Sequence, residues 1–374
     1  FTKNSINRIV KVQAIGYIEN ERFISGASFL PMIGNVCRIP TTDEINQIYL
    51  NNYISDYRDY TVTIGHTLQE NTKVTLPINE FFASHIGVFG NTGSGKSNTL
   101  HKLYYELFAL NNLPKLKEKS NFLVLDFNGE YAHDNSFGIS KGEDKKVYKL
   151  STQQDSNDKF PVTEEVFFEE EMLSILFSAT EQTQRPFLSR VIKGINKYGS
   201  GTESLSKWVN WLYRTILTSD VNKNLLNLLN DTLEKYIDGI SKYMKKVKKI
   251  EVYTGQSKPK YRIKSLCLYF DGDFEEKHNK QINLTDITTY IKDSNIDEFK
   301  ELEIRCHLQM IADLLYGNII EDHIAPLIRR IESRLYSIEK YLTIEEQVSE
   351  PPFLQIISLS ELNQDAKKIL SMLV

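Results

Sequence analysis

The residues best suited to chemistry are eight in a row, Gly90-Asn91-Thr92-Gly93-Ser94-Gly95-Lys96-Ser97. They match the spacing G-x-x-x-x-G-K-[ST] at every fixed position, and this is the spacing of a loop that wraps around nucleotide phosphates. Glycines let backbone N–H groups turn toward phosphate oxygens without a Cβ in the way. We expect Lys96 to reach the β- and γ-phosphates and the Ser97 hydroxyl to ligate Mg²⁺. The predicted phosphate-binding residues are Gly90, Asn91, Thr92, Gly93, Ser94, Gly95, Lys96, Ser97 and Asn98.

A second stretch, "FLVLDFNGEY" at residues 122–131, is four apolar residues followed by Asp126, Glu130 and Tyr131. A buried parallel strand presents its carboxyl end to ligands. Asp126 and Glu130 are therefore candidates for catalysis, contacting the water shell of Mg²⁺ or responding to the γ-phosphate. The alternative is that Glu130 only caps or pairs with a neighbouring group.

The elements around the loop are the ones such a loop requires. "HIGVFG" (residues 85–90) predicts a brief strand before it, and "NTLHKLYYELFAL" (98–110) predicts a helix after it. On that helix Leu100, Leu103, Leu107 and Phe108 share one face. Strand, glycine-rich turn and helix in this order indicate an α/β P-loop NTPase with a mainly parallel sheet.

The rest of the chain divides into segments of different character. Residues 8–76 are rich in β-branched residues punctuated by Gly and Pro, as in "PMIGNVCRIP" and "YTVTIGHT", which favours a small β-barrel or sandwich. Residues 132–160 are polar and loop-like, whereas 164–346 carry apolar residues at helical spacing. "PFLQIISLS" and "NQDAKKILSMLV" then predict one more strand and helix. We therefore expect a barrel at 1–76, an ATPase core at 77–160, a helical insertion at 161–350, and a return to the core at 351–374.

Composition excludes little but sets limits. The 374 residues are 41% hydrophobic and 25% charged, with a net charge of −4, so no overall basic character indicates a nucleic-acid binder. Contacts with DNA would have to come from local patches or from a pore lined by several subunits. The three cysteines have neither disulfide nor metal spacing, no apolar run is long enough for a membrane span, and a reduced cytoplasmic location is expected.

Guanine specificity is not expected, because no Asn-Lys pair is followed by Asp two residues later, and ATP is the predicted nucleotide. The combination of "SHIGVFGNTGSGKSNT" and "FLVLDFNGEY" resembles the HerA branch of the HerA/FtsK ring ATPases. That family carries an N-terminal β-barrel, the same loop, a D-x-H-G-E-Y-like motif and a helical insertion. Asn128 stands where the family has His, so a proton-carrying role at that position is in doubt.

The resemblance implies a hexameric ring that hydrolyses ATP and moves along double-stranded DNA. It also implies that a separate downstream strand, and not Asp126, supplies the principal Mg²⁺-site carboxylates. Implied partners are a nuclease or another effector such as a sirtuin-type NAD hydrolase, docked on the N-terminal barrel, in DNA processing or anti-phage defence. The alternatives are a nucleotide-gated ring scaffold that regulates an effector without moving DNA, and a monomeric nucleotide kinase.

Two further expectations concern the rest of the chain. Between Lys242 and Lys264 lie nine basic residues and three tyrosines, which suit either a DNA-facing patch or a solvated surface, and the solvated surface is favoured. The expected helix at the end runs to Val374 without a stop signal. We expect the native polypeptide to continue, with a carboxylate-bearing strand after roughly 10 to 25 further residues.

Overall fold

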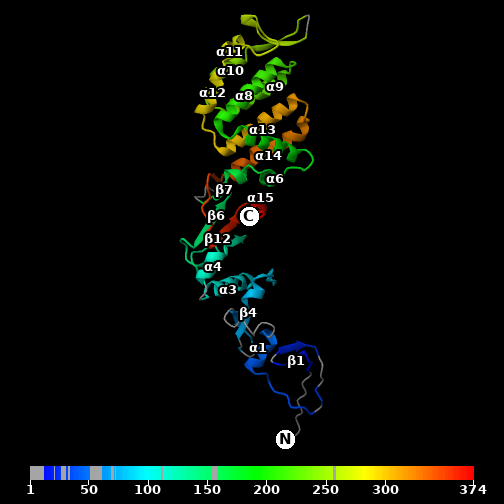
Figure 1. Cartoon of the computed structure of the whole chain (residues 1–374), viewed down its shortest axis with the longest axis vertical. Helices are drawn as coiled ribbons and strands as arrows, with labels where there is room; N and C mark the ends of the chain where they lie inside the picture. The colour runs from blue at the N-terminus through cyan, green and yellow to red at the C-terminus, as the bar shows by residue number, and fades with distance from the viewer. Residues whose placement is uncertain are drawn as a thin grey trace. The chain divides into compact units, whose positions relative to one another are not determined.

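The computed structural model describes residues 12–20, 22–26, 31–32, 34–50, 61–68, 71, 73–110, 113–153, 158–255 and 258–374. The chain divides into two compact units. Figure 1 labels their helices and strands. Unit 1 comprises residues 1–123, 130–146 and 352–355, and unit 2 comprises 124–129, 147–351 and 356–374. None of the helices in these described ranges combines the length and the apolar character that crossing a bilayer requires.

The described residues of the N-terminal part of unit 1 contain two separate antiparallel hairpins. Strand β1 (Gly16–Glu19) pairs with β2 (Arg22–Ser25), and β3 (Thr61–His66) pairs with β4 (Lys73–Pro77). Between them lies a helix that the sequence did not predict, α1 (Thr42–Leu50). Part of this region, including residues 1–11 and 51–60, lies outside the described residues. Barrel closure is not seen in the described part and stays a prediction.

The strand expected in "PMIGNVCRIP" does not form in its described residues, 31–32 and 34–40. Met32, Val36 and Ile39 are 79%, 97% and 80% exposed. A β-branched composition favours a strand only where a neighbouring strand covers the side chains and pairs the backbone. This segment has no such neighbour among the described residues.

Around the glycine-rich loop the predicted helix is present and the predicted strand is not. Helix α3 (Lys96–Phe108) buries Leu103, Leu107 and Phe108 as expected, while Leu100 is half-buried. Two short helices flank the region, α2 (Ile78–Phe81) and α4 (Leu113–Lys119). Residues 85–90 have no strand pairing and Phe89 is 94% exposed, so the strand prediction for "HIGVFG" is wrong for this structure.

The central sheet is parallel, and its strands among the described residues are three, in the order β5-β12-β6. Strands β5 (Phe122–Asp126) and β12 (Leu354–Glu361) were both predicted. Strand β6 (Lys145–Ser151) was not, because the polar residues of 132–160 concealed its buried Val147, Tyr148 and Leu150. In unit 1, the rings of Phe108, Phe122 and Phe353 pack edge to face with centroids 4.9 to 5.2 Å apart.

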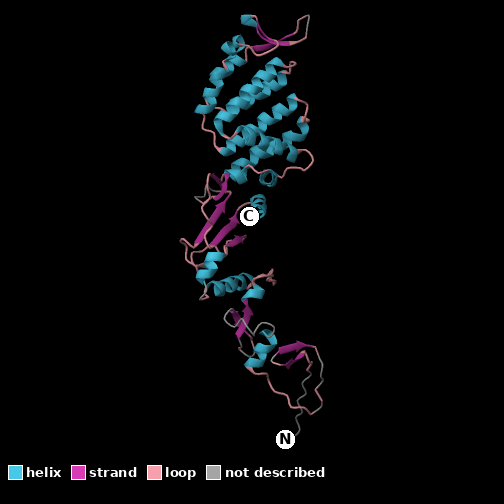
Figure 2. Ribbon diagram, viewed as in Figure 1, coloured by secondary structure: helices cyan, strands magenta, loops and turns pink. Residues whose placement is uncertain are grey.

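Unit 2 is mainly helical, as expected for most of 164–346 (Figure 2). Its helices are α5 (Glu164–Phe167), α6 (Glu170–Phe177), α7 (Gln184–Tyr198), α8 (Gly201–Thr218), α9 (Lys223–Tyr236), α10 (Ser241–Val247), α11 (Glu276–Ile282), α12 (Leu284–Asp293), α13 (Glu298–Leu315), α14 (Glu321–Ile338) and α15 (Gln364–Leu373). Helix α13 packs against α7, α8, α9 and α14, and α12 packs against α8. One small sheet of unit 2 pairs β7 (Phe160–Thr163) with β11 (Leu342–Glu345). Another has the order β10 (Leu268–Phe270), β9 (Lys260–Ile263) and β8 (Ile250–Tyr253).

A buried ion pair joins α13 to the turn between α7 and α8. Arg305 is 0% exposed, and its Nε donates to Glu301 Oε1 at 2.7 Å. Its Nη2 donates to the carbonyl of Gly199 at 2.9 Å, while Glu301 accepts the backbone N–H of Gly201 at 2.8 Å. The pair therefore holds both sides of the glycine turn at the start of α8.

Candidate nucleotide-binding site

The glycine-rich loop of unit 1 has the backbone that a phosphate cradle needs. Gly93 and Gly95 lie in the left-handed region at φ +79° and +89°, where residues with a Cβ are strained. A Cβ at Gly90 would collide with the Ser94 hydroxyl. The loop turns at Ser94, whose N–H donates to the Asn91 carbonyl at 3.1 Å. These glycines therefore fit a loop whose backbone closes around phosphate oxygens.

Helix α3 begins directly from this loop, with Gly95 as its N-cap. No side chain caps the helix there, so the unpaired N–H groups of its first turn are available to an anion. The Lys96 ammonium donates to the Asn91 carbonyl at 2.9 Å, and this holds it against the loop. A phosphate is a stronger acceptor than a neutral carbonyl because it carries full charge, so the residues present fit a nucleoside triphosphate.

Residues 130–139 contact α3 within unit 1, and the sequence did not reveal this. The Tyr131 hydroxyl donates to the Ser97 carbonyl at 3.0 Å. One turn further along α3, His101 Nε2 accepts the backbone N–H of Phe137 at 2.8 Å. The position of Tyr131 directly after Glu130 in "NGEY" was the one available signal, since a contact across 34 residues leaves no local pattern.

The end of β5, in unit 2, places Asp126 in a turn. Its side chain is 2% exposed, and Oδ1 accepts the Gly129 N–H at 2.9 Å. Gly129 has φ +78°, and a Cβ there would lie 3.0 Å from Ser360 Oγ on β12. One oxygen of Asp126 is thus used to shape the turn after the strand. Its catalytic role, like that of the exposed Glu130 in unit 1, stays a prediction.

Among the described residues, one cluster of His and carboxylate groups has metal-ligand spacing. It comprises Glu303 and His307 on α13 and Glu332 on α14, with ligand atoms within 4.8 Å of one another. The Lys235 ammonium lies 2.8 Å from Glu332 and 3.4 Å from Glu303, and the Tyr236 hydroxyl contacts both carboxylates. The lysine already supplies the positive charge that the carboxylates need. The cluster is therefore an ion-pair network that joins α9, α13 and α14.

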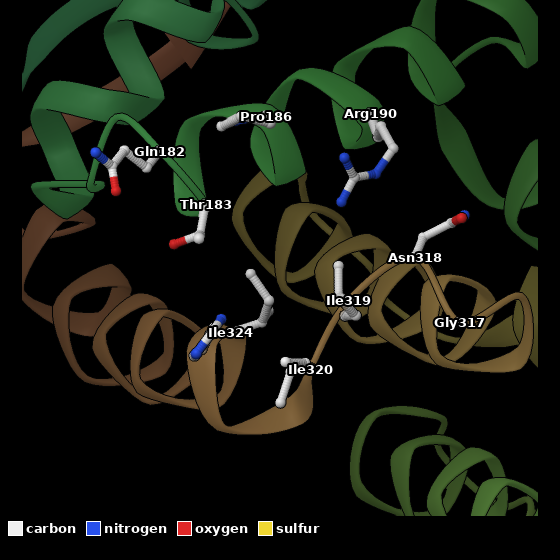
Figure 3. A pocket seen from close by; sticks show the side chains of 10 residues that line it. Gln182, Thr183, Pro186, Arg190, Gly317, Asn318, Ile319, Ile320 and Ile324 are labelled. Carbon is white, nitrogen blue, oxygen red and sulfur yellow. The ribbon is translucent and has the colours of Figure 1, made fainter.

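A pocket of about 290 Å³ lies within unit 2 beside the start of α7 (Figure 3). Its walls are the first turns of α7, the loop of residues 317–320 and the start of α14. Arg190 is its cationic side chain, and the guanidinium is paired with Asp313 at 2.9 Å. This ion pair occupies the Arg190 guanidinium and so lowers the net positive charge that the pocket offers to a phosphate.

The basic segment 242–264 is only partly available to a ligand. Four of its nine basic side chains form ion pairs: Lys246 with Asp286, Lys248 with Glu234, Lys260 with Asp271, and Arg262 with Glu251. Tyr243 and Tyr261 are each 1% exposed and belong to the core. Buried rings cannot stack on bases, which agrees with the favoured interpretation of a solvated surface.

Residues 62–289, more than half of the chain, match the family described as "Helicase HerA, central domain". The chain is also similar to the "DNA double-strand break repair helicase HerA" of Saccharolobus solfataricus, with 30% identity over 115 residues, 31% of this chain and 20% of that protein. The "Probable helicase MJECL08" of Methanocaldococcus jannaschii is 29% identical over 130 residues, 34% of this chain and 22% of that protein. The aligned regions thus span about a fifth of these relatives. With the loop geometry and the family match in agreement, this chain belongs to the HerA helicase family through its central domain.

Proposed function

We propose that this chain is an ATP- and Mg²⁺-dependent motor that assembles into a hexameric ring and translocates on double-stranded DNA. The observation that carries the proposal is the glycine-rich loop, with Gly93 and Gly95 at positive φ and Lys96 at its mouth. When bound, Mg²⁺ would supply positive charge that offsets the charge of the phosphates. Lys96 would hold the β- and γ-phosphates, and Ser97 would ligate the metal.

A ring explains how the site is completed. Phosphoryl transfer builds negative charge on the γ-phosphate, and many NTPases neutralise it with an arginine from the adjacent subunit. A cyclic assembly of identical chains repeats that interface once per subunit. The pore of such a ring would accept a duplex without overall basicity, which is compatible with the net charge of −4. We propose DNA as the substrate because the similar protein of Saccharolobus solfataricus is described as a DNA double-strand break repair helicase.

The N-terminal region, residues 1–76, is the proposed docking site for an effector. A barrel there would hold the ring together and bind a nuclease or a sirtuin-type effector, in DNA processing or anti-phage defence. We place this assembly in the cytoplasm, since Cys37 and Cys267 are exposed and free and Cys306 is buried and free.

A second candidate is a nucleotide-gated ring scaffold that regulates an effector without moving DNA. The observations that support this second candidate are the ion pairing of four basic side chains in 242–264 and the net negative charge of the chain. In it the loop would bind ATP to control assembly, and DNA would have no effect on turnover.

The test is ATP turnover with and without duplex DNA, together with the mass of the assembly by light scattering. A motor gives turnover that duplex DNA stimulates several-fold, at a mass several times the 43.3 kDa of one chain. The same mass with no stimulation supports the scaffold. If the protein that turns over ATP has the 43.3 kDa mass of a single chain, the result would support the monomeric kinase and contradict both ring proposals.

A further inference from the structure

The segment that begins with Tyr131, the last residue of "NGEY", is hydrogen-bonded to α3, the helix that carries Lys96 and Ser97. We infer that Tyr131 is a positioning residue for ATP turnover, which acts by fixing the backbone of Ser97 and so the hydroxyl that ligates Mg²⁺. This inference rests on the proposed ATPase function and adds to it a residue outside the glycine-rich loop. All of its contacts lie within unit 1.

The first contact is made at the metal ligand itself. The Tyr131 hydroxyl donates to the Ser97 carbonyl at 3.0 Å, in the first turn of α3. The first turn of a helix is the part that frays most readily, because its N–H groups have no partner within the helix. A hydrogen bond from outside the helix restrains the peptide plane of Ser97, and the position of its Oγ follows from that plane.

The second contact holds the next turn of α3. The rings of Tyr131 and His101 are parallel within 9°, with centroids 6.5 Å apart. Phe137 packs on both, at 5.1 Å from Tyr131 and 5.0 Å from His101, and its backbone N–H donates to His101 Nε2 at 2.8 Å. Two hydrogen bonds, one turn apart, therefore fasten residues 131–137 to the start of α3.

The segment is itself rigid enough to serve as a support. The Lys145 ammonium is buried, with the residue 1% exposed, and its three N–H groups are shared among five oxygens that lie 2.8 to 3.1 Å from Nζ. These oxygens belong to His133, Asp134, Ser136 (carbonyl and hydroxyl) and Ile139. A buried ammonium is stable only when its donors are satisfied, so the lysine and the segment fix each other.

The geometry separates binding from chemistry. The Tyr131 hydroxyl donates to the carbonyl of Ser97, whereas the groups that would hold the phosphates are backbone N–H donors of the loop. Loss of the hydroxyl should therefore leave ATP affinity nearly intact and misplace the metal ligand. Misplacement of a reacting geometry by about 1 Å can cost roughly 100-fold in rate, and a smaller displacement is expected here because both rings stay packed.

The experiment compares Tyr131→Phe with wild type in the full chain, measuring turnover against ATP and, separately, against Mg²⁺. We expect kcat to fall by roughly 10-fold and the half-saturating Mg²⁺ concentration to rise several-fold, with KM for ATP at saturating Mg²⁺ within about twofold. The melting temperature should change little, because the ring remains. Tyr105→Phe is the matched control, since the Tyr105 ring also stacks on His101, with centroids 6.1 Å apart, and Tyr105 is 41% exposed.

Three results would overturn the inference. Unchanged kcat and Mg²⁺ requirement would show that the Tyr131 hydroxyl does not matter for turnover. A raised KM for ATP with a lowered melting temperature would make Tyr131 merely structural. An equal effect of Tyr105→Phe would remove the specificity for the Ser97 contact. An inactive wild-type protein would instead refute the proposed function, so the two failures are distinguishable.

Discussion

At the scale of single residues, Lys96 carries the strongest prediction. Lys96→Ala should abolish measurable ATP turnover, because no other side chain of the loop supplies a positive charge to the γ-phosphate. Lys102→Ala, on the same helix and paired with Glu106, is the control and should retain turnover. Turnover assays of both variants at saturating ATP check this, and near-normal activity in Lys96→Ala would remove the central assignment.

Glu130 is predicted to act in turnover and not in binding. It is exposed at the start of the segment that holds α3, so Glu130→Ala should preserve the fold and lower kcat at least several-fold with ATP affinity unchanged. Glu143→Ala, another exposed carboxylate of unit 1, should leave kcat unaltered. Binding of a fluorescent ATP analogue and steady-state kinetics measure the two parts separately. If the two variants behave alike, Glu130 is structural.

His101 predicts a pH dependence of stability. Burial, then the charges of His133, Lys145 and Lys102, hold the pKa of His101 below its usual 6.5. A depressed pKa means that the unfolded chain binds the proton more tightly, so this group's contribution is present above about pH 6.5 and is lost as pH falls toward the folded-state pKa. Protonated Nε2 also cannot accept the Phe137 N–H. The side chain of His101→Gln offers a hydrogen-bond acceptor and does not titrate. In this variant the denaturant midpoint of unfolding should change less between pH 7.5 and pH 5 than it does in wild type.

At the scale of elements, the Arg305–Glu301 pair predicts a large loss of stability. Arg305→Met leaves the Glu301 carboxylate buried without its counter-charge, which should cost about 3 to 5 kcal/mol. Lys207→Met breaks the Lys207–Glu203 pair, whose side chains are 71% and 69% exposed, and should lower stability much less, because solvent screens exposed charges. Urea unfolding compares the two. The double variant Arg305→Met/Glu301→Met should recover part of the loss, and no recovery would contradict an uncompensated charge as its cause.

Helices and strands could be predicted from the sequence where the spacing of the apolar residues matches the residues that the structure buries. Strands β5 and β12 and helix α3 were predicted, because their apolar residues fall into unbroken runs or a single helix face. Residues 85–90 were predicted as a strand and are not one, since apolar character cannot reveal whether a partner strand exists. Strand β6 was missed among polar neighbours. In the site, the loop was evident from its spacing, while the Tyr131–Ser97 contact depends on tertiary packing alone.

At the scale of the whole molecule, the N-terminal region predicts a separable assembly function. Strand β3 contacts α3, and its Val62 is 1% exposed, so a truncation that removed residues 61–76 would disturb the helix of the site. Deleting residues 1–60 spares that contact. We expect this variant to bind ATP normally and to lose the oligomer or the effector.

Light scattering and nucleotide titration of the deletion variant measure these two properties. A variant that still assembles and still binds its effector would assign both functions to the rest of the chain. Loss of ATP binding as well would show that residues 1–60 support the site itself.

The five oxygens around the Lys145 ammonium form the kind of shell that proteins also offer to a potassium ion. Here the cation is tethered to β6 by its own side chain, so it cannot exchange with the medium. The support of α3 should accordingly be indifferent to whether the buffer contains K⁺ or Na⁺. Lys145→Met would vacate that shell and leave its oxygens to the solvent ions. Turnover that is insensitive to the choice of alkali cation in wild type, and sensitive to it in Lys145→Met, would identify the lysine as a built-in replacement for a monovalent salt requirement.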